Sequence, residues 1–190
     1  MLAIILNKVC TATIWIMLPV YAIQFLGITE GLYGFLPTLN AVMVLLLQLP
    51  VTQFSKRQNR FTMMIMAALL YTSGALTIMT ARGFEALALA FVIFTLGELI
   101  LEPTAATYIA EIAPPHMRGR YMGVAGQAWN AGQGVGPVMS GALSDSFGPR
   151  SQWAGAAAAS LMSAMLFAAL RLRNKNAAQA SPAGDEIGSV

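Results

Sequence analysis

The chain has 190 residues, of which 57% are hydrophobic and only 10% are charged. Average soluble domains carry roughly 25% charged residues, so this composition excludes an ordinary water-soluble fold. In a bilayer, the same length has room for about six helices of ~20 residues with short loops. The single cysteine, Cys10, excludes an internal disulfide framework and a multi-cysteine metal cluster. The composition therefore predicts an integral membrane protein.

Charged residues divide the chain into apolar runs, because an ion at the bilayer centre costs about 2.5–3.5 kcal/mol on insertion scales. These runs are continuous and do not alternate with a period of two, which favours helices over a β-barrel. We expect an all-α membrane domain over residues 1–173 with six transmembrane helices, at about residues 4–29, 31–55, 61–81, 86–113, 118–145 and 151–171. Residues 174–190 are rich in alanine, serine, asparagine and glycine, which predicts a disordered cytoplasmic tail.

Lysine and arginine are distributed unequally between the two ends of the predicted spans. Only Arg82 and Arg150 lie at one end. The other end has nine basic residues: Lys8, Lys56, Arg57, Arg60, Arg118, Arg120, Arg171, Arg173 and Lys175. By the positive-inside rule, this bias predicts that both termini are cytoplasmic. The same residues can face anionic lipid headgroups, so the net charge of +3 does not require a nucleic-acid partner.

The fourth span contains two acidic residues, Glu98 and Glu102, shortly before Pro103. Their spacing places both carboxylates on one face of a helix, about 6 Å apart. Two like charges this close in a low dielectric cannot both ionise cheaply, and acids inside a membrane usually face a cavity or a partner. We interpret the pair as candidate proton-binding or substrate-binding groups. Alternatively, one glutamate ties its helix to a neighbour while the other lies near the water boundary.

Polar amides in other spans are further candidates for lining a cavity, with hydrogen bonding between helices as the alternative for each. The candidates are Gln24 in the first span, Asn40 in the second, and Gln127 and Asn130 in the fifth.

Small residues recur four apart in the fifth span, at Gly132, Gly136 and Ser140. Such a stripe lets another helix approach closely. At the cytoplasmic end of the fourth span, Glu111 is expected to form an ion pair with Arg118 or Arg120 across the intervening turn, in preference to contacting a substrate.

Several motifs of enzymes and motors are missing from the sequence. It has no Gly-x-x-x-x-Gly-Lys-Ser/Thr phosphate loop, no Gly-x-Ser-x-Gly elbow and no His-Glu-x-x-His metal motif. We therefore expect neither an enzyme nor an ATP-driven motor, and no cofactor or metal.

The segment Ala113–Gly123, together with Gly97, Glu98 and Pro103 upstream, resembles the tenth helix, cytoplasmic turn and eleventh helix of a major facilitator superfamily transporter. The loop Gln53–Arg60 keeps the basic character of the family's loop between helices eight and nine, but lacks its glycine and aspartate. Six residues are spaced like the signature of bacterial drug–proton antiporters, with serine replacing one glycine: Gly123, Gly132, Gly136, Pro137, Ser140 and Gly141.

This resemblance covers residues 1 to about 173 as helices seven to twelve. It implies two inverted repeats of three helices, in which helices nine and twelve are peripheral and the other four line a central cavity. It also implies a proton-coupled carrier that exports amphipathic compounds through the bacterial inner membrane, with an N-terminal six-helix half as partner. A homodimer of two copies and a truncated, non-transporting membrane protein are the alternatives. No motif identifies the substrate.

Overall fold

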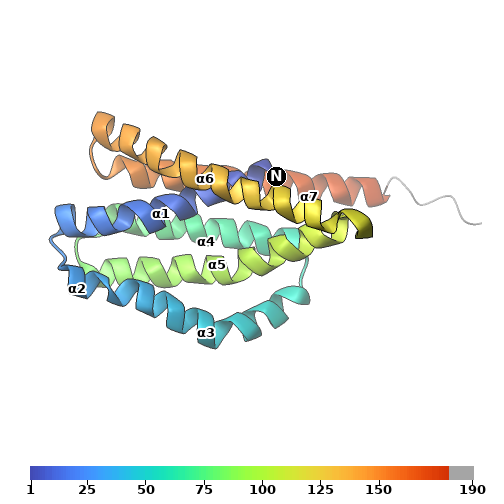
Figure 1. Ribbon diagram of the computed structural model, residues 1–190, viewed down its shortest axis with the longest axis horizontal. Coiled ribbons are helices and arrows are strands. Elements are labelled where there is room, and N and C mark those ends of the chain that lie inside the picture. The colour runs from blue at the N-terminus through green and yellow to red at the C-terminus, as the bar shows by residue number, and fades with distance from the viewer. Residues whose placement is uncertain (180–190) are drawn as a thin grey trace, which may run out of the picture.

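The computed structural model describes residues 1–179 and consists of six long helices joined by short connections. The long helices are α1 (Leu2–Leu26), α3 (Phe35–Lys56), α4 (Arg60–Thr80), α5 (Phe84–Ile112), α6 (Arg118–Phe147) and α7 (Ser151–Gln179). A short helix, α2 (Glu30–Tyr33), leads into α3, and a 3-10 turn, η1 (Pro115–Met117), separates α5 from α6. The helices lie side by side as one elongated bundle (Figure 1). The predicted all-α class is confirmed.

Five of these segments are long and apolar enough to cross a membrane: Leu2–Leu26, Glu30–Lys56, Arg60–Thr80, Phe84–Ile112 and Ser151–Asn176. The second of them combines α2 and α3. Helix α6 has sufficient length, at 30 residues, but its glycines and polar side chains lower its hydropathy. It packs closely along α1. Polar residues in a membrane helix are tolerated where they face protein or a cavity, so the six long helices remain compatible with the six predicted spans.

Local sequence sets where several helices begin and end. Helix α1 ends at Gly27, whose φ of 66° is the left-handed conformation that glycine adopts without strain. The side chain of Asn59 accepts a hydrogen bond from the Thr62 amide at 3.2 Å and caps the start of α4. Helix α7 continues to Gln179, so residues 174–179 of the predicted tail are helical. The rest of that tail lies outside the described residues.

Basic residues gather at one end of the bundle. The α3–α4 and α5–α6 connections lie at the same end, and the α1–α2, α4–α5 and α6–α7 connections lie at the other (Figure 1). Lys8 is an exception, because it lies inside α1 and is only 6% exposed. The predicted span of residues 4–29 already included Lys8, but the count of basic residues placed this lysine at the end of the bundle. Eight basic residues therefore remain at this end, not nine.

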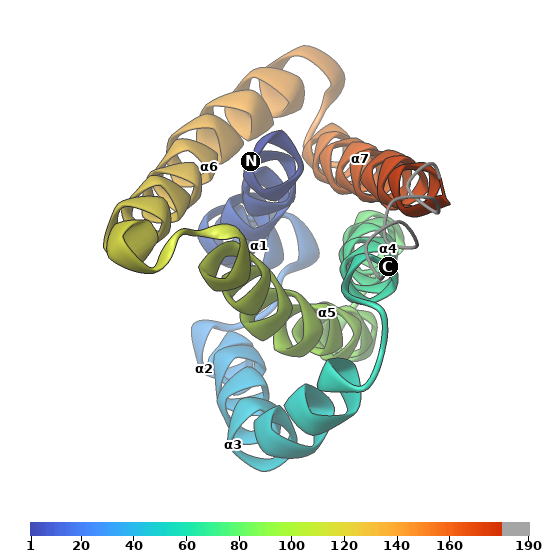
Figure 2. The ribbon, with the colours of Figure 1, turned by 90° about the vertical axis from the view of Figure 1, so that its right-hand side faces the viewer.

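The packing follows the predicted inverted repeat of two helix triplets. The first triplet is α1, α3 and α4, and the second is α5, α6 and α7. Helix α1 packs against α6 and α7 of the second triplet, whereas α5 packs against α3 and α4 of the first, and α4 packs against α7. Exchanging the two triplets maps this pattern onto itself. Seen along the bundle, α4 and α7 lie together on one side, and α6, α1, α5 and α3 follow one another across the other (Figure 2).

An aromatic core holds α5 in place. Tyr71 of α4 and Phe94 of α5 are fully buried, with ring centroids 5.0 Å apart in an edge-to-face arrangement. Gly97 permits this approach, because a Cβ there would lie only 3.0 Å from the Tyr71 ring. The core fixes one face of α5 against α4 and leaves the face that carries Glu98 and Glu102 directed toward α1 and α3.

The small residues of α6 face α1. A Cβ added at Gly132 would lie 2.8 Å from the backbone carbonyl carbon of Lys8, and one at Gly136 would lie 2.9 Å from the Cβ of Ala12. Ser140 continues this line, with its hydroxyl 2.9 Å from that of Thr13. The two backbones can approach this closely only because glycine has no side chain.

This contact predicts the effect of adding one methyl group. We expect Gly132→Ala to destabilise the bundle by about 1–3 kcal/mol, because overpacking forces the α1 and α6 backbones apart. Gly134→Ala is the matched control, since a Cβ there meets nothing within 4 Å. Thermal unfolding of the detergent-purified protein measures both. Equal stability of the two variants would contradict the observed packing.

Candidate functional site

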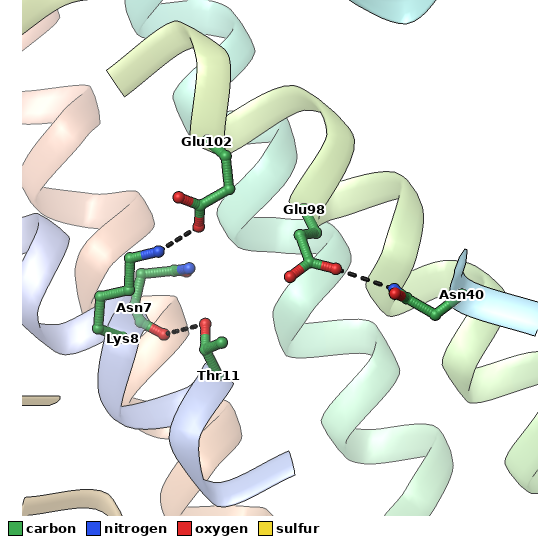
Figure 3. A network of polar contacts seen from close by, with 6 residues as sticks. All are labelled: Asn7, Lys8, Thr11, Asn40, Glu98 and Glu102. Atoms are coloured by element: carbon green, nitrogen blue, oxygen red, sulfur yellow. Dashed lines mark hydrogen bonds and ion pairs between the residues drawn. The ribbon is translucent and has the colours of Figure 1, made fainter. Parts of the chain in front are cut away.

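Lys8 is the centre of a polar cluster between α1, α5 and α6. Its ammonium forms an ion pair with Glu102 of α5 (Figure 3). The Nζ atom also lies 3.9 Å from the ring centroid of Trp129 on α6, which is a cation–π contact. The Lys8 side chain is 7% exposed and that of Glu102 is 43% exposed. The lysine is therefore the buried member of the pair, held between a carboxylate and an indole.

The second acid of α5, Glu98, is bound to α3. The Asn40 amide nitrogen donates to Glu98 Oε2 at 2.9 Å (Figure 3). It also donates to the Thr95 hydroxyl at 2.9 Å. Thr95 in turn donates to the backbone carbonyl of Phe91 at 2.7 Å. A primary amide has two N–H donors, so both donors of Asn40 are used. This arrangement fixes the orientation of the buried Asn40 side chain and ties α3 to α5.

A cavity of about 330 Å³ lies beside the lysine. This volume falls at the lower end of the range of about 300–1,000 Å³ for small-molecule sites. One wall is aromatic, because Trp15 packs edge-on against Phe91 and Phe94, with ring centroids 5.7 and 6.0 Å away. The cavity is lined by Lys8, Thr11, Ala12, Trp15, Ile16, Glu98, Trp129 and Gln133.

The charges around this cavity do not cancel. One lysine faces two carboxylates, so the group carries one net negative charge when all three residues are ionised. An uncompensated charge is expensive in a medium of low dielectric. One proton or one monovalent cation neutralises the group. The arrangement is therefore chemically suited to binding either one.

Next to Lys8 on α1, the buried Asn7 makes a polar contact with α7. The hydroxyl of Ser160 on α7 lies 2.9 Å from Asn7 Oδ1. The Thr11 hydroxyl donates to the backbone carbonyl of Asn7 at 3.1 Å (Figure 3). These contacts fix the turn of α1 that carries Lys8.

Only some of the residues singled out from the sequence come together here. Asn40, Glu98 and Glu102 come together around α5, where Glu102 binds Lys8 of α1 and Glu98 binds Asn40 of α3. Gln24, Gln127 and Asn130 are exposed and do not line the cavity.

The remaining predicted positions lie on α6 and take different environments. A Cβ at Gly123 or Gly141 would meet nothing within 4 Å, whereas Gly132 and Gly136 contact α1. Pro137 lies within the helix, beside Gly136.

Glu111 pairs with a different residue from the one expected. Its partner is Arg60 at the start of α4, and not Arg118 or Arg120. Helices α4 and α5 pack along each other, which brings the first turn of one to the last turn of the other. Both side chains of the pair are nearly half exposed, so the contact is worth only about 0–1 kcal/mol.

Sequence reasoning missed Lys8, Thr11, Trp15, Trp129 and Gln133. A signal for Lys8 was present, because the apolar residues from Leu2 to Leu6 precede it and place it about two turns inside the first helix, not at the end. Trp129 and Gln133 also had a signal. They are one turn apart and lie on either side of Gly132 in the sequence. This spacing places both of them on the same flank of α6, next to the small-residue stripe that faces α1.

A model of the Major Facilitator Superfamily matches residues 1–189 of the chain. The chain is 30% identical over 132 residues to the uncharacterized MFS-type transporter YqjV of Bacillus subtilis, covering 68% of this chain and 32% of that protein. It is 31% identical over 133 residues to the multidrug resistance protein MdtH of Aeromonas hydrophila, covering 70% and 33%. An uncharacterized MFS-type transporter of Methanocaldococcus jannaschii is 32% identical over 136 residues, covering 68% and 34%.

The helical bundle and its apolar spans define a multi-pass membrane protein. The chain belongs to the Major Facilitator Superfamily. The matched regions make up 32–34% of the lengths of these relatives, so the chain corresponds to a part of them.

The ion pair predicts an asymmetric pair of stability effects. We expect Glu102→Gln to destabilise the protein more than Lys8→Met, because Glu102→Gln leaves a buried ammonium without its carboxylate. Breaking a fully buried pair costs about 3–5 kcal/mol, and the exposure of Glu102 places this case below that range. The double variant should recover much of the loss. Unfolding in detergent measures the four states, and strictly additive effects would contradict a direct interaction.

Proposed function

We propose that the chain forms one half of a secondary transporter that couples the movement of a proton to that of a small amphipathic molecule. The observation that carries this proposal is a pair of acids at a cavity of about 330 Å³: Glu98 lines it, and Glu102 binds Lys8, which also lines it. Each acid is bound to a different neighbouring helix. Membership of the Major Facilitator Superfamily supports transport. The acids inside the bundle support the proton as coupling ion.

The contacts of the two acids suggest how binding alters the protein. Glu102 connects α5 to α1 through Lys8, and Glu98 connects α5 to α3 through Asn40. A proton on either carboxylate removes the charge that its partner binds and so weakens that contact. A proton and a cationic substrate then compete for the same negative charge. Their differential effect on these contacts shifts the equilibrium between conformations.

An N-terminal six-helix half is the proposed partner. The matched part of the chain covers about a third of the length of these relatives, which leaves room for a second half. Helix α3 packs mainly against α5 and exposes Leu45, Leu46 and Leu49 at 81%, 66% and 73%. Substrate would bind near the bilayer midplane between the halves, as in other carriers built from repeats. A second copy of the chain presenting the same face is the alternative partner.

Export of amphipathic compounds is the direction we favour. Two of the relatives, from Aeromonas hydrophila and Aeromonas salmonicida, are named multidrug resistance proteins. We also propose a bacterial inner-membrane location with both termini in the cytoplasm, because eight basic residues lie at one end of the bundle.

Neutralising either acid tests the proposed function. We expect Glu98→Gln and Glu102→Gln, made singly in the complete transporter, to reduce proton-coupled transport to background. A glutamine side chain cannot bind and release a proton as a carboxylate does. Glu111→Gln is the matched control, since Glu111 pairs with Arg60 at the end of the bundle. Substrate-driven proton flux in vesicles is the measurement. Full activity in both Glu98→Gln and Glu102→Gln would reject the proposed role of these residues.

Two variants, each with one added cysteine, test the orientation. Cys10 is fully buried, so it does not need to be removed. We expect Gln58→Cys, in the α3–α4 connection, to be protected from a membrane-impermeant thiol reagent in intact cells, and Glu85→Cys, at the start of α5, to be labelled. The reverse pattern would place the basic end outside.

A further inference from the structure

The Lys8 ammonium occupies a place that has the features of a binding site for an organic ammonium ion. Its ammonium is buried, bound to a carboxylate and placed 3.9 Å from the centroid of an indole ring. A carboxylate beside an aromatic face is the combination that recognises organic ammonium ions. Lysine reaches this place on a flexible four-carbon stem, so its head can leave while its backbone stays in α1.

We propose that the site formed by Glu102 and Trp129 takes organic monocations, and that Lys8 is a tethered competitor that a cationic ligand displaces. This inference rests on the proposed transport function for its biological meaning, but it concerns binding alone.

The surroundings of the ammonium fit such a ligand. Lys8 lines the cavity and its ammonium binds Glu102, whose side chain is 43% exposed, so a cation that takes the place of the ammonium meets this carboxylate. Trp15 and Ile16 provide apolar surface for the body of an amphipathic cation, beside the polar groups of Thr11 and Gln133. Glu98 also faces the cavity and attracts positive charge. These features favour a ligand that joins one positive head to an apolar body.

The charge count limits the ligand to a single positive charge. Lys8, Glu98 and Glu102 together carry one net negative charge when all are ionised, and one monocation neutralises it. Once displaced, the Lys8 ammonium stays tethered to α1 and continues to offset one carboxylate. A dication would leave a net positive charge in the site, and an anion would add a second uncompensated negative charge. The site therefore discriminates by charge as well as by shape.

Binding of two probes of nearly equal shape and opposite charge tests this inference. Tetraphenylphosphonium is the cation and tetraphenylborate is the anion, and equilibrium dialysis against the detergent-purified complete protein measures each. We expect Lys8→Gln to bind the phosphonium about tenfold more tightly or better, because it removes one positive charge within a few ångströms of the site. We expect the borate to bind poorly to the unaltered protein.

Substitutions at Trp129 separate a ligand site from a structural ion pair. Trp129→Leu should weaken phosphonium binding by about threefold to thirtyfold through loss of the cation–π contact, whereas Trp129→Phe should retain most of it. Glu111→Gln, at the end of the bundle, should leave binding unchanged. An effect of Lys8→Gln in folded protein that is absent or reversed would overturn the proposal.

The borate provides a second outcome that would overturn it. Tight borate binding that Lys8→Gln abolishes would make Lys8 the ligand for an anion.

If Lys8→Gln does not fold, Lys8→Arg and the Trp129 variants test the same competition. Arg preserves the charge, so phosphonium affinity should stay within about threefold of the unaltered value, and a large gain would contradict competition. Binding without transport would reject the proposed function and leave this inference standing, whereas transport without these binding effects would do the reverse.

Discussion

The buried ammonium of Lys8 must be compensated, and this need determines how α1, α5 and α6 pack together. Lys8 lies within a membrane-spanning helix, where an unpaired charge costs several kcal/mol. Its carboxylate comes from α5 and its aromatic contact from α6, so one side chain requires three helices to meet. The close approach of α6 depends on Gly132, whose position against the Lys8 backbone leaves no room for a Cβ. The small-residue stripe and the ion pair are thus two parts of one arrangement.

The inverted repeat explains why the acids and their partners occupy these helices. Exchange of the two triplets maps the α1–α6 contact onto the α5–α3 contact. Lys8 with Trp129 lies in the first of these contacts, and Glu98 with Asn40 lies in the second. The ion pair between Lys8 and Glu102 then joins α1 to α5, the helices that the exchange interchanges. Polar groups therefore gather where the two repeats meet, and α4 and α7 supply the apolar packing behind them.

The sequence predicted the all-α fold and the acids, because a carboxylate stands out within an uncharged run. It did not predict Lys8 in the cluster, since the count of basic residues assigned this lysine to the cytoplasmic end, although the predicted span of residues 4–29 includes it. It assigned Glu111 to arginines near it in the chain, whereas helix packing brings Arg60 to it. Such a contact between α4 and α5 depends on which helices are neighbours. Helices α4 and α5 are neighbours because their aromatic residues, among them Tyr71 and Phe94, pack together, and no short motif in the sequence reveals this contact.

The amides of α6 show that part of the missing information was present in the amino-acid order. Successive residues in an α-helix are separated by about 100° around the axis. Gly132 faces α1, which places Gln127 and Asn130 roughly 140–160° away from that contact and leaves them exposed. Trp129 and Gln133 lie only about 60–100° away, on the flank that borders the cavity. A polar residue in a glycine-rich membrane helix therefore acquires meaning from its angle to the glycine stripe, because the stripe marks the face that a neighbouring helix covers.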